Sequence, residues 1–211
     1  MQDIATIRRE YTRAELTQES VAAEPLEQLS AWLSDAVVSQ VHEPTAMTLS
    51  TVNDAGRPSS RVVLAKSIDS GIVFFTNYES RKGHDLAAHP FASLVFFWPE
   101  LERQVRVEGS VEKVPRAVSE AYWISRPFTS RIGATASKQS TTLDSREELE
   151  RLVDELSIEW VDGNVPLPET WGGYRVVPDY FEFWQGRASR LHDRIAYIGK
   201  GQEWGLVRLS P

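Results

Sequence analysis

The sequence predicts an α+β protein, mainly β with flanking helices, whose centre is an antiparallel barrel. Four to five strand-like segments follow one another between residues 46 and 114 without a long helix between them. Parallel strands need long crossover connections, usually helices, so this order favours antiparallel pairing over a parallel nucleotide-binding sheet. Apolar residues at helical spacing are confined to a few stretches that can cover such a sheet.

The N-terminal part of the chain is predicted to be helical. Ile4, Ile7, Arg8 and Tyr11 indicate a short helix, and residues 16–24 a polar connection. Pro25 is suited to the first position of a second helix. We expect that helix to cover one side of the sheet with Leu26, Leu29, Trp32, Leu33, Ala36 and Val37.

Strands begin at Ala46, where the period of the apolar residues changes to two, and a turn follows at residues 53–56. The next strand, residues 60–66, has an apolar centre. We therefore expect it to be buried on both faces, with Arg61 and Lys66 as a cation at each end. Residues 72–76 form another strand after a turn at residues 69–71.

Residues 80–88 predict a short helix that begins with Arg81 and Lys82. Cations at the start of a helix oppose its macrodipole, a local cost that makes sense if an anion lies between them and the backbone amides. We expect His84 and His89 to lie on the exposed side of this helix.

The second half of the chain completes the sheet. Residues 91–98 and 102–114 predict two strands, and Pro115 begins a helix that ends at Arg126. Residues 128–142 have no periodicity, so we expect a loop, either ordered at a ligand site or mobile. Ser145 and Glu148 form a capping box for a structural helix. Four further strands are predicted at residues 174–177, 180–185, 190–198 and 204–209.

The 211 residues are expected to form one domain, with an N-terminal helical segment over residues 1–45 and the barrel with its flanking helices over residues 46–211, because nothing suggests a linker. The absence of cysteine excludes disulfides and thiolate chemistry, and a cytoplasmic location is expected. The sequence shows neither a recognisable signal peptide nor an apolar run of about 18 residues, so we expect no membrane-spanning segment.

The charge distribution points to a small anionic ligand. A net charge of -7 weighs against a general nucleic-acid binder. Residues 57–138 carry 12 Lys and Arg against 8 Asp and Glu, whereas the rest of the chain carries 11 against 22. This concentration of cations predicts a specific anion site, and a solvated charged face is the alternative.

Several common motifs are absent. No Gly-x-Gly-x-x-Gly follows a strand and no phosphate loop is present, so a bound phosphate must be held by side chains. The four histidines fall in no metal-ligand spacing, and no Gly-x-Ser-x-Gly elbow occurs. Hydrolase and metalloenzyme functions are therefore disfavoured, and no metal is expected.

Residues 182–194 concentrate arginine, histidine and aromatic residues. Strand-like segments on both sides predict a hairpin with its turn at residues 186–189. Alternation along the returning strand would present Arg190, His192 and Arg194 on one face, a set suited to a planar anion. A solvated edge strand protected by charge is the alternative. Arg187 is expected to be only solvated.

Eleven short motifs, in the same order along the chain, resemble the pyridoxine (pyridoxamine) 5′-phosphate oxidase family. They are Arg8-Arg9-Glu10-Tyr11, Pro44-Thr45-Ala46-Met47, Arg61-Val62-Val63-Leu64-Ala65-Lys66, Phe75-Thr76-Asn77, Ser80-Arg81-Lys82, Glu102-Arg103-Gln104-Val105, Ser125-Arg126-Pro127, Ser137-Lys138-Gln139-Ser140, Trp171-Gly172-Gly173, Glu182-Phe183-Trp184-Gln185-Gly186 and Arg190-Leu191-His192-Asp193-Arg194. Each motif alone is weak, but their order makes the resemblance specific and extends it over nearly the whole chain.

The resemblance implies a split β-barrel homodimer with two FMN molecules at the subunit interface. By position, the FMN contacts would be Arg61, Val62, Val63, Leu64, Ala65, Lys66, Phe75, Thr76, Arg81, Lys82, Gln104, Gln139, Ser140, Trp184 and Arg194. Arg61, Arg81, Lys82 and Ser140 are the chemically sensible ligands of the FMN phosphate. Lys66, Tyr122, Arg126 and Ser130 would hold a substrate phosphate, and Arg190 and His192, as the catalytic pair, would face the substrate ring.

The implied reaction is the FMN-dependent oxidation of pyridoxine 5′-phosphate and pyridoxamine 5′-phosphate to pyridoxal 5′-phosphate in vitamin B6 metabolism. A hydride passes from the substrate to the flavin, and dioxygen then reoxidises the flavin and gives hydrogen peroxide. Arg190 would orient the ring, and His192 would be a hydrogen-bond partner or proton carrier. The alternatives are a related flavin oxidase acting on a phenazine precursor, or a carrier of flavin or pyridoxal phosphate without catalytic activity.

Overall fold

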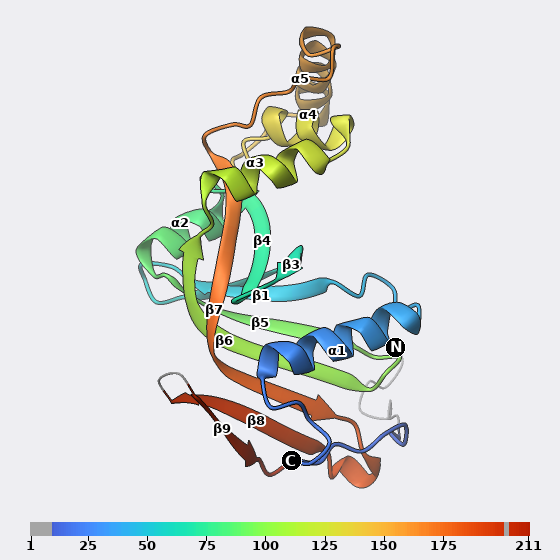
Figure 1. Cartoon of the computed structure of the whole chain (residues 1–211). Coiled ribbons are helices and arrows are strands. Elements are labelled where there is room, and N and C mark those ends of the chain that lie inside the picture. The colour runs from blue at the N-terminus through green and yellow to red at the C-terminus, as the bar shows by residue number, and fades with distance from the viewer. Residues whose placement is uncertain (1–9, 201–202) are drawn as a thin grey trace, which may run out of the picture.

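The computed structural model describes residues 10–200 and 203–211, and within these ranges the strands form one antiparallel sheet (Figure 1). The strand order is β2-β1-β5-β6-β7-β4-β3, and β8 pairs with β7 and β9. The strands are β1 Ala46–Val52, β2 Pro58–Leu64, β3 Ser67–Ile68, β4 Ile72–Asn77, β5 Phe91–Trp98, β6 Arg103–Lys113, β7 Trp171–Gln185, β8 Asp193–Lys200 and β9 Glu203–Arg208.

The long strand β7 divides the sheet. Its first half pairs with β4 and its second half with β8, while β6 runs along its other edge. A register shift after Glu108, where Gly109 comes to face Pro178, lies between the two halves. Bulges of this kind bend a strand and increase its twist. The sheet therefore curls into a half-barrel, which confirms the predicted antiparallel split-barrel class.

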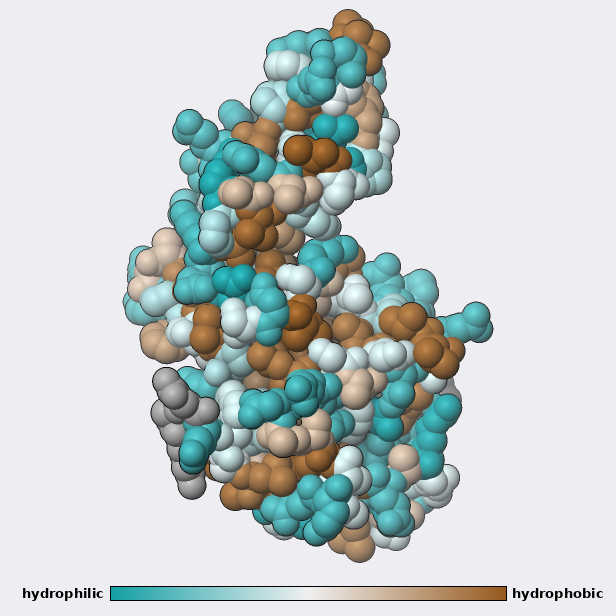
Figure 2. Space-filling model, viewed as in Figure 1, coloured by the Kyte–Doolittle hydropathy of each residue, from teal (hydrophilic) through white to brown (hydrophobic). Residues whose placement is uncertain are grey.

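The helices are α1 Pro25–Val38, α2 Arg81–Ala88, α3 Arg116–Ser125, α4 Phe128–Ala136 and α5 Arg146–Glu159, with a short 3₁₀ turn, η2, at Ala188–Arg190. In Figure 1, α1 crosses one face of the sheet, whereas α3, α4 and α5 form a lobe beyond the N-terminal end of β7. Figure 2 shows a hollow where this lobe meets the body of the sheet. No helix in the described ranges has the length and apolarity needed to cross a membrane.

Two apolar clusters stabilise these parts. The larger one joins α1 to the inner face of the sheet, and Trp32 meets Phe183 edge to face at 5.2 Å. The smaller one holds the lobe together around Trp123, Ile132 and Trp171. Because Trp171 begins β7, the smaller cluster also attaches the lobe to the sheet.

Most predicted elements are confirmed, with end positions that differ by a few residues. The helices at α1, α2, α3 and α5 form where their patterns indicate them, and Ser145 caps α5 by accepting a hydrogen bond from the Glu148 amide. His84 and His89 are exposed, as expected. Residues 174–185 form one bulged strand where two were predicted. The helix predicted around Ile4 and Ile7 lies mostly outside the described residues, and residues 10–17 form no helix.

Two predictions about elements are wrong. Residues 128–136 form the helix α4 and not a loop, because Ile132 is buried against Trp123 and Trp171. Strand β2 is not buried on both faces, since Val62 is 66% exposed. The strand lies at the edge of the sheet, so only one face of it reaches the core, where Val63 packs partly buried, and Val62 faces the cavity edge and open surface.

The hairpin after β7 also differs from its prediction. Strand β8 begins only at Asp193, and Arg190 lies in the turn η2 with φ 61°. Arg190 and His192 therefore do not alternate with Arg194 along one strand. Arg187 is not merely solvated, because its guanidinium lies 2.7 Å from a Glu15 carboxylate oxygen and 3.7 Å from one of Asp193.

Candidate functional site

A cavity of about 1050 Å³ lies between the sheet and the lobe. Its walls come from β2, β4, the start of α2, the helices α3 and α4, and the segment after α4. Fourteen of the predicted site residues line it: Arg61, Val62, Val63, Leu64, Lys66, Phe75, Thr76, Arg81, Lys82, Tyr122, Arg126, Ser130, Gln139 and Ser140. Segments far apart in the sequence thus meet at one site.

The cavity is strongly cationic. Arg61, Lys66, Arg81, Lys82 and Arg126 line it, and none of the lining residues in the described chain is Asp or Glu. Cations gathered without carboxylates repel one another and remain available to a ligand. The cavity is therefore suited to a ligand that carries more than one negative charge.

Lys82 is buried among neutral acceptors. Its ammonium group donates to Thr76 Oγ1 at 3.0 Å, to Ser80 Oγ at 3.0 Å and to Gln139 Oε1 at 2.8 Å. Burial, with a further contribution from the charge of Arg61, lowers the pKa of Lys82 to about 8. An anion in the cavity would supply the missing countercharge.

The guanidinium of Arg61 is held by hydrogen bonds to two hydroxyl groups. Its Nη1 donates to Thr51 Oγ1 at 2.8 Å, and its Nη2 donates to Ser59 Oγ at 2.6 Å. Burial lowers the pKa of Arg61, and the nearby carboxylate of Asp85 partly offsets that effect. These contacts leave the guanidinium in the cavity wall with a fixed orientation.

The side of the cavity formed by the lobe combines aromatic rings with a second cation. Phe75 and Tyr122 stack with centroids 4.0 Å apart, and the Arg126 guanidinium lies 4.7 Å from the centroid of Trp171. Arg126 Nη2 donates to the backbone oxygen of Ser130, whereas the buried Nη1 has no partner in the described chain. This buried donor is therefore available to a ligand in the cavity.

The remaining predicted site residues lie elsewhere. Ala65 is buried and does not line this cavity. Gln104, Trp184 and Arg194 are direct partners in β6, β7 and β8, so they form a row across the sheet. Paired residues of an antiparallel sheet point to the same face, and the neighbouring Val105, Phe183 and Ile195 occupy the core face. The row therefore lies on the outer face.

Glu182 orients Arg194 in this row. Its carboxylate accepts from Arg194 Nε at 2.9 Å and Nη2 at 3.0 Å, and from Arg106 Nη1 at 3.1 Å. Burial raises the pKa of Glu182, but the bonds from Arg194 and the charges of both arginines outweigh burial and keep the pKa below its usual value. Glu182 is therefore an ionised anchor, and the fork of Arg194 is held rigidly.

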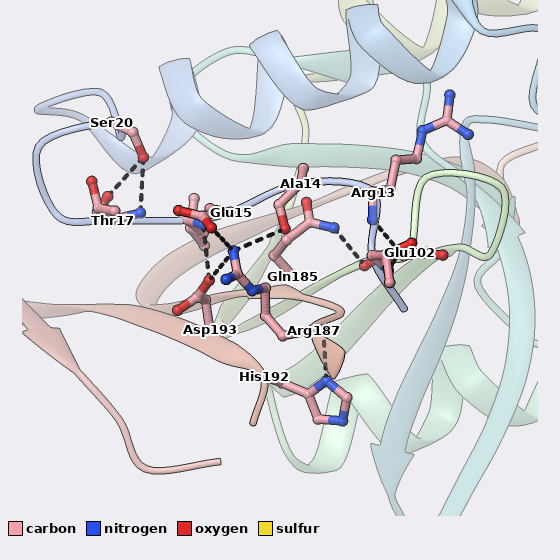
Figure 3. A network of polar contacts seen from close by, with 12 residues as sticks. Arg13, Ala14, Glu15, Thr17, Ser20, Glu102, Gln185, Arg187, His192 and Asp193 are labelled. Carbon is pink, nitrogen blue, oxygen red and sulfur yellow. Dashed lines mark hydrogen bonds and ion pairs between the residues drawn. The ribbon is translucent and has the colours of Figure 1, made fainter. Parts of the chain in front are cut away.

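His192 lies close to the row, and its ring centroid is 4.6 Å from that of Trp184. The backbone N–H of Arg187 donates to His192 Nδ1 at 3.1 Å, as Figure 3 shows. Burial and the charge of Arg190 lower the pKa of His192. The lowered pKa and the N–H donated to Nδ1 both favour the neutral ring, whose proton is then on Nε2.

A segment before α1 packs against this hairpin. Glu102 Oε2 accepts from the amides of Thr12 and Arg13, each at 3.0 Å, and Asp193 accepts from the amide of Leu16 at 3.1 Å (Figure 3). Tyr11 then meets Trp184 edge-on at 5.7 Å. The segment thus positions the row from a distant part of the sequence.

Sequence reasoning missed several residues of the site. Ser59, Ser60, Asn77, Gly133, Ala134, Ser137 and Trp171 also line the cavity. Alternation around Arg61 could have indicated Ser59, which points with Arg61 to one face. Glu102 and Glu182 belong to motifs of the family resemblance, but no sequence signal gives them a role, and none marks Asp85. The partners of all three are brought to them by folding.

Two family descriptions match the chain. Residues 33–159 match "Pyridoxamine 5′-phosphate oxidase", and residues 171–211 match "Pyridoxine 5′-phosphate oxidase C-terminal dimerisation region". Proteins named pyridoxine/pyridoxamine 5′-phosphate oxidase are similar over the full length of both chains. Those from Thermosynechococcus vestitus and Burkholderia ambifaria are 54% and 52% identical to this chain.

Solved structures show the same fold. PhzG from Burkholderia lata 383, in complex with tetrahydrophenazine-1-carboxylic acid, is 34% identical with a TM-score of 0.88, over 93% of this chain and 98% of that one. A pyridoxamine 5′-phosphate oxidase-related, FMN binding protein from Nostoc punctiforme is 16% identical with a TM-score of 0.69, over 90% and 100% of the two chains.

Proposed function

Because the chain belongs to the pyridoxamine 5′-phosphate oxidase family, we propose that it oxidises pyridoxine 5′-phosphate and pyridoxamine 5′-phosphate to pyridoxal 5′-phosphate, with FMN as cofactor, dioxygen as electron acceptor and hydrogen peroxide as the second product. The observation that carries this proposal is the cavity with five cations and no carboxylate among its lining residues. Both the proposed cofactor and the proposed substrate carry a phosphate, so two groups of cations are required.

The first group, Arg61, Arg81, Lys82 and Ser140, would hold the FMN phosphate. The fit rests on Lys82, whose bonds go only to neutral acceptors. A phosphate dianion would give this buried ammonium the countercharge it lacks in the described chain. Residues 62–64 and Lys66, with Phe75, Thr76 and Gln139, would contact the rest of the cofactor.

The second group, Lys66, Tyr122, Arg126 and Ser130, would hold the substrate phosphate. Its fit rests on the unpaired Nη1 of Arg126 in the cavity wall. Tyr122 and Ser130 add hydroxyl groups that can donate to phosphate oxygens. Fixing the phosphate at one end of a small substrate would restrict where its reacting carbon can lie.

A second copy of the chain would complete the site. Gln104, Trp184 and Arg194 lie on the outer face of the sheet, and Phe97 on the same face is 52% exposed. This face continues to Val62 at the cavity edge, and the chain contains the C-terminal dimerisation region of the family. We propose a homodimer in which the outer row of one protomer reaches the cavity of its partner.

FMN, when bound, would supply the hydride acceptor and the reactivity toward dioxygen. The protein's own residues would position the cofactor and the substrate and neutralise their negative charges. Arg190 would orient the substrate ring, and His192, neutral with its proton on Nε2, would donate a hydrogen bond to it. His192 Nδ1 already accepts from the Arg187 amide, which favours this donor role over that of a proton acceptor.

One competing function has a specific observation in its favour. PhzG, with a TM-score of 0.88, was solved with a tetrahydrophenazine carboxylic acid, a ligand without a phosphate. The group of Lys66, Tyr122, Arg126 and Ser130 in this chain favours a phosphorylated substrate instead. The 54% identity to a pyridoxine/pyridoxamine 5′-phosphate oxidase also exceeds the 34% identity to PhzG.

Oxygen-dependent peroxide release would test the proposal. We expect the purified, FMN-loaded protein to release peroxide with pyridoxine 5′-phosphate or pyridoxamine 5′-phosphate, and not with tetrahydrophenazine-1-carboxylic acid. The reverse preference would transfer the assignment to the phenazine reaction. Binding of flavin without turnover of any of the three compounds would indicate a carrier.

A further inference from the structure

Asp85 lies behind the cavity wall and is not among the residues that line it. It belongs to α2 and is only 5% exposed. Its Oδ2 accepts from Thr51 Oγ1 at 2.6 Å and from Ser59 Oγ at 3.3 Å. A buried carboxylate that accepts hydrogen bonds from hydroxyl groups on two neighbouring strands requires a structural or functional reason.

The two hydroxyl groups connect Asp85 to Arg61. Each hydroxyl has one hydrogen, and both hydrogens point to Asp85, so each oxygen is left to accept a hydrogen bond. Arg61 supplies these bonds, from Nη1 to Thr51 at 2.8 Å and from Nη2 to Ser59 at 2.6 Å. The carboxylate therefore determines the direction of both hydroxyl groups. These hydroxyls, together with the Leu49 backbone oxygen that accepts from Nη1 at 3.2 Å, fix the plane of the guanidinium.

Asp85 does not directly pair with Arg61 at hydrogen-bond distance. The separation between Arg61 Nη2 and Asp85 Oδ2 is 3.8 Å, longer than a bidentate arginine–carboxylate contact. A direct pair would occupy the fork of the guanidinium, whereas the contact through hydroxyl groups holds one edge only. The other edge of Arg61 stays in the cavity wall for a ligand.

We propose that Asp85 is a positioning residue of the cofactor site, which acts through the hydroxyl groups of Thr51 and Ser59 to direct Arg61 at the FMN phosphate. The inference rests on the proposed function, because it assigns the anion at Arg61 to FMN. The purely structural alternative is that Asp85 only ties α2 to the β1–β2 hairpin. The two differ in what they predict for a ligand that lacks the phosphate.

Riboflavin is such a ligand, since it is FMN without the phosphate. Asp85→Ala removes the one oxygen, Oδ2, to which both hydroxyl groups donate, so neither hydroxyl is directed any longer. We expect the Kd for FMN to rise about 10-fold, the size of one lost charge-assisted hydrogen bond. The Kd for riboflavin should stay within about 2-fold of wild type, because riboflavin does not use Arg61. Flavin fluorescence quenching measures both constants.

Matched variants complete the experiment. Asp54→Ala, in the exposed β1–β2 turn, should leave both constants unchanged. In an Arg61→Ala background, Asp85→Ala should cause no further loss of FMN affinity, because the residue through which it acts is gone. If Asp85→Ala does not fold, Ser59→Ala at a half-buried position should raise the Kd for FMN selectively by about 3-fold.

The outcomes that overturn the inference are distinct from failure of the proposed function. Equal weakening of FMN and riboflavin, an additive effect in the Arg61→Ala background, or no change in FMN affinity would each reduce Asp85 to a structural contact. A wild-type protein that does not bind FMN would instead refute the proposed function, and the inference with it.

Discussion

At the scale of single residues, the unbalanced charge of Lys82 links the cavity to protein stability. Its pKa, about 8, lies below the ordinary lysine value of about 10.4. Between these two pH values the unfolded chain binds more protons than the folded chain, so the free energy of unfolding rises with pH. The penalty for burying the charge is fully present below pH 8 and disappears as the pH increases.

Lys82→Met should remove this pH dependence. In FMN-free protein, we expect the wild type to gain stability relative to Lys82→Met between pH 8 and pH 10, by up to about 1 kcal/mol per pH unit. Urea unfolding at several pH values measures the difference, and Lys138→Met, at an exposed lysine, is the control. A difference that stays constant over this range would show that Lys82 carries no unbalanced charge.

Two arginines should separate cofactor binding from turnover. Arg61→Ala should raise the Kd for FMN at least about 10-fold, because Arg61 lies in the cavity wall. Arg190→Ala should lower turnover far more than FMN affinity, since Arg190 is exposed in the hairpin turn. Equilibrium flavin binding and peroxide release give the two readouts, with Arg57→Ala as an exposed control. Loss of FMN from Arg190→Ala with full activity after reconstitution would reverse these roles.

Only some residues of the site could be predicted from the sequence. Cations and hydroxyl groups of the cavity could be identified from short motifs, because those motifs are local. The roles of Asp85, Glu102 and Glu182 could not be predicted, since their partners are brought together only by folding. The prediction that Arg187 is only solvated was wrong for the same reason, because its partner Glu15 is far away along the chain.

At the scale of elements, the segment before α1 depends on one buried carboxylate. Glu102 accepts two backbone amides through a single oxygen, Oε2, and Gly186 lies so close to Tyr11 that a Cβ there would be 2.7 Å from the ring. Residues 10–16 are thereby fixed against the hairpin that carries Trp184 and His192. This contact couples a segment without helix or strand to the proposed active site.

Glu102→Ala should release this segment. Losing the acceptor of two amides should lower the free energy of unfolding by about 1–3 kcal/mol and expose residues 10–16 to proteases. Glu102→Gln keeps an oxygen in the same place and should retain most of the stability. Chemical denaturation and limited proteolysis test both variants, and equal behaviour of the two would contradict the role given to Oε2.

The elements that were predicted wrongly share a physical cause. Helix α4 has no side-chain cap, and its sequence is rich in residues of low helix propensity. It forms because Ile132 packs into the lobe. The apolar run of β2 indicates burial, but such a run cannot distinguish a strand in the core from a strand in the wall of a cavity. The turn at Ser189 and Arg190 has positive φ at two non-glycine residues, which no propensity predicts.

At the scale of the whole molecule, the antiparallel class was predictable because several strands follow one another in the sequence. The division of the sheet by β7 was not, since it depends on which strand pairs with each half. Within one chain the predicted site residues fall into two groups, the cavity and the outer row. This separation is the structural argument for a site shared between protomers.

Mixing two inactive variants would test the shared site. Arg61→Ala damages the cavity and Arg194→Ala damages the outer row, so a mixed dimer contains one intact site when the two regions come from different protomers. We expect random exchange to restore about a quarter of wild-type activity. Mixed dimers that form, as shown by differently tagged chains, but remain inactive would indicate that each site is built from one protomer.

An absorption spectrum under anaerobic conditions can establish whether this protein is an FMN-dependent oxidase of phosphorylated B6 vitamers. We predict that the purified protein shows a flavin band, that pyridoxine 5′-phosphate bleaches it without oxygen, and that air restores it. A flavin band that is unchanged by pyridoxine 5′-phosphate and by pyridoxamine 5′-phosphate would contradict the assignment.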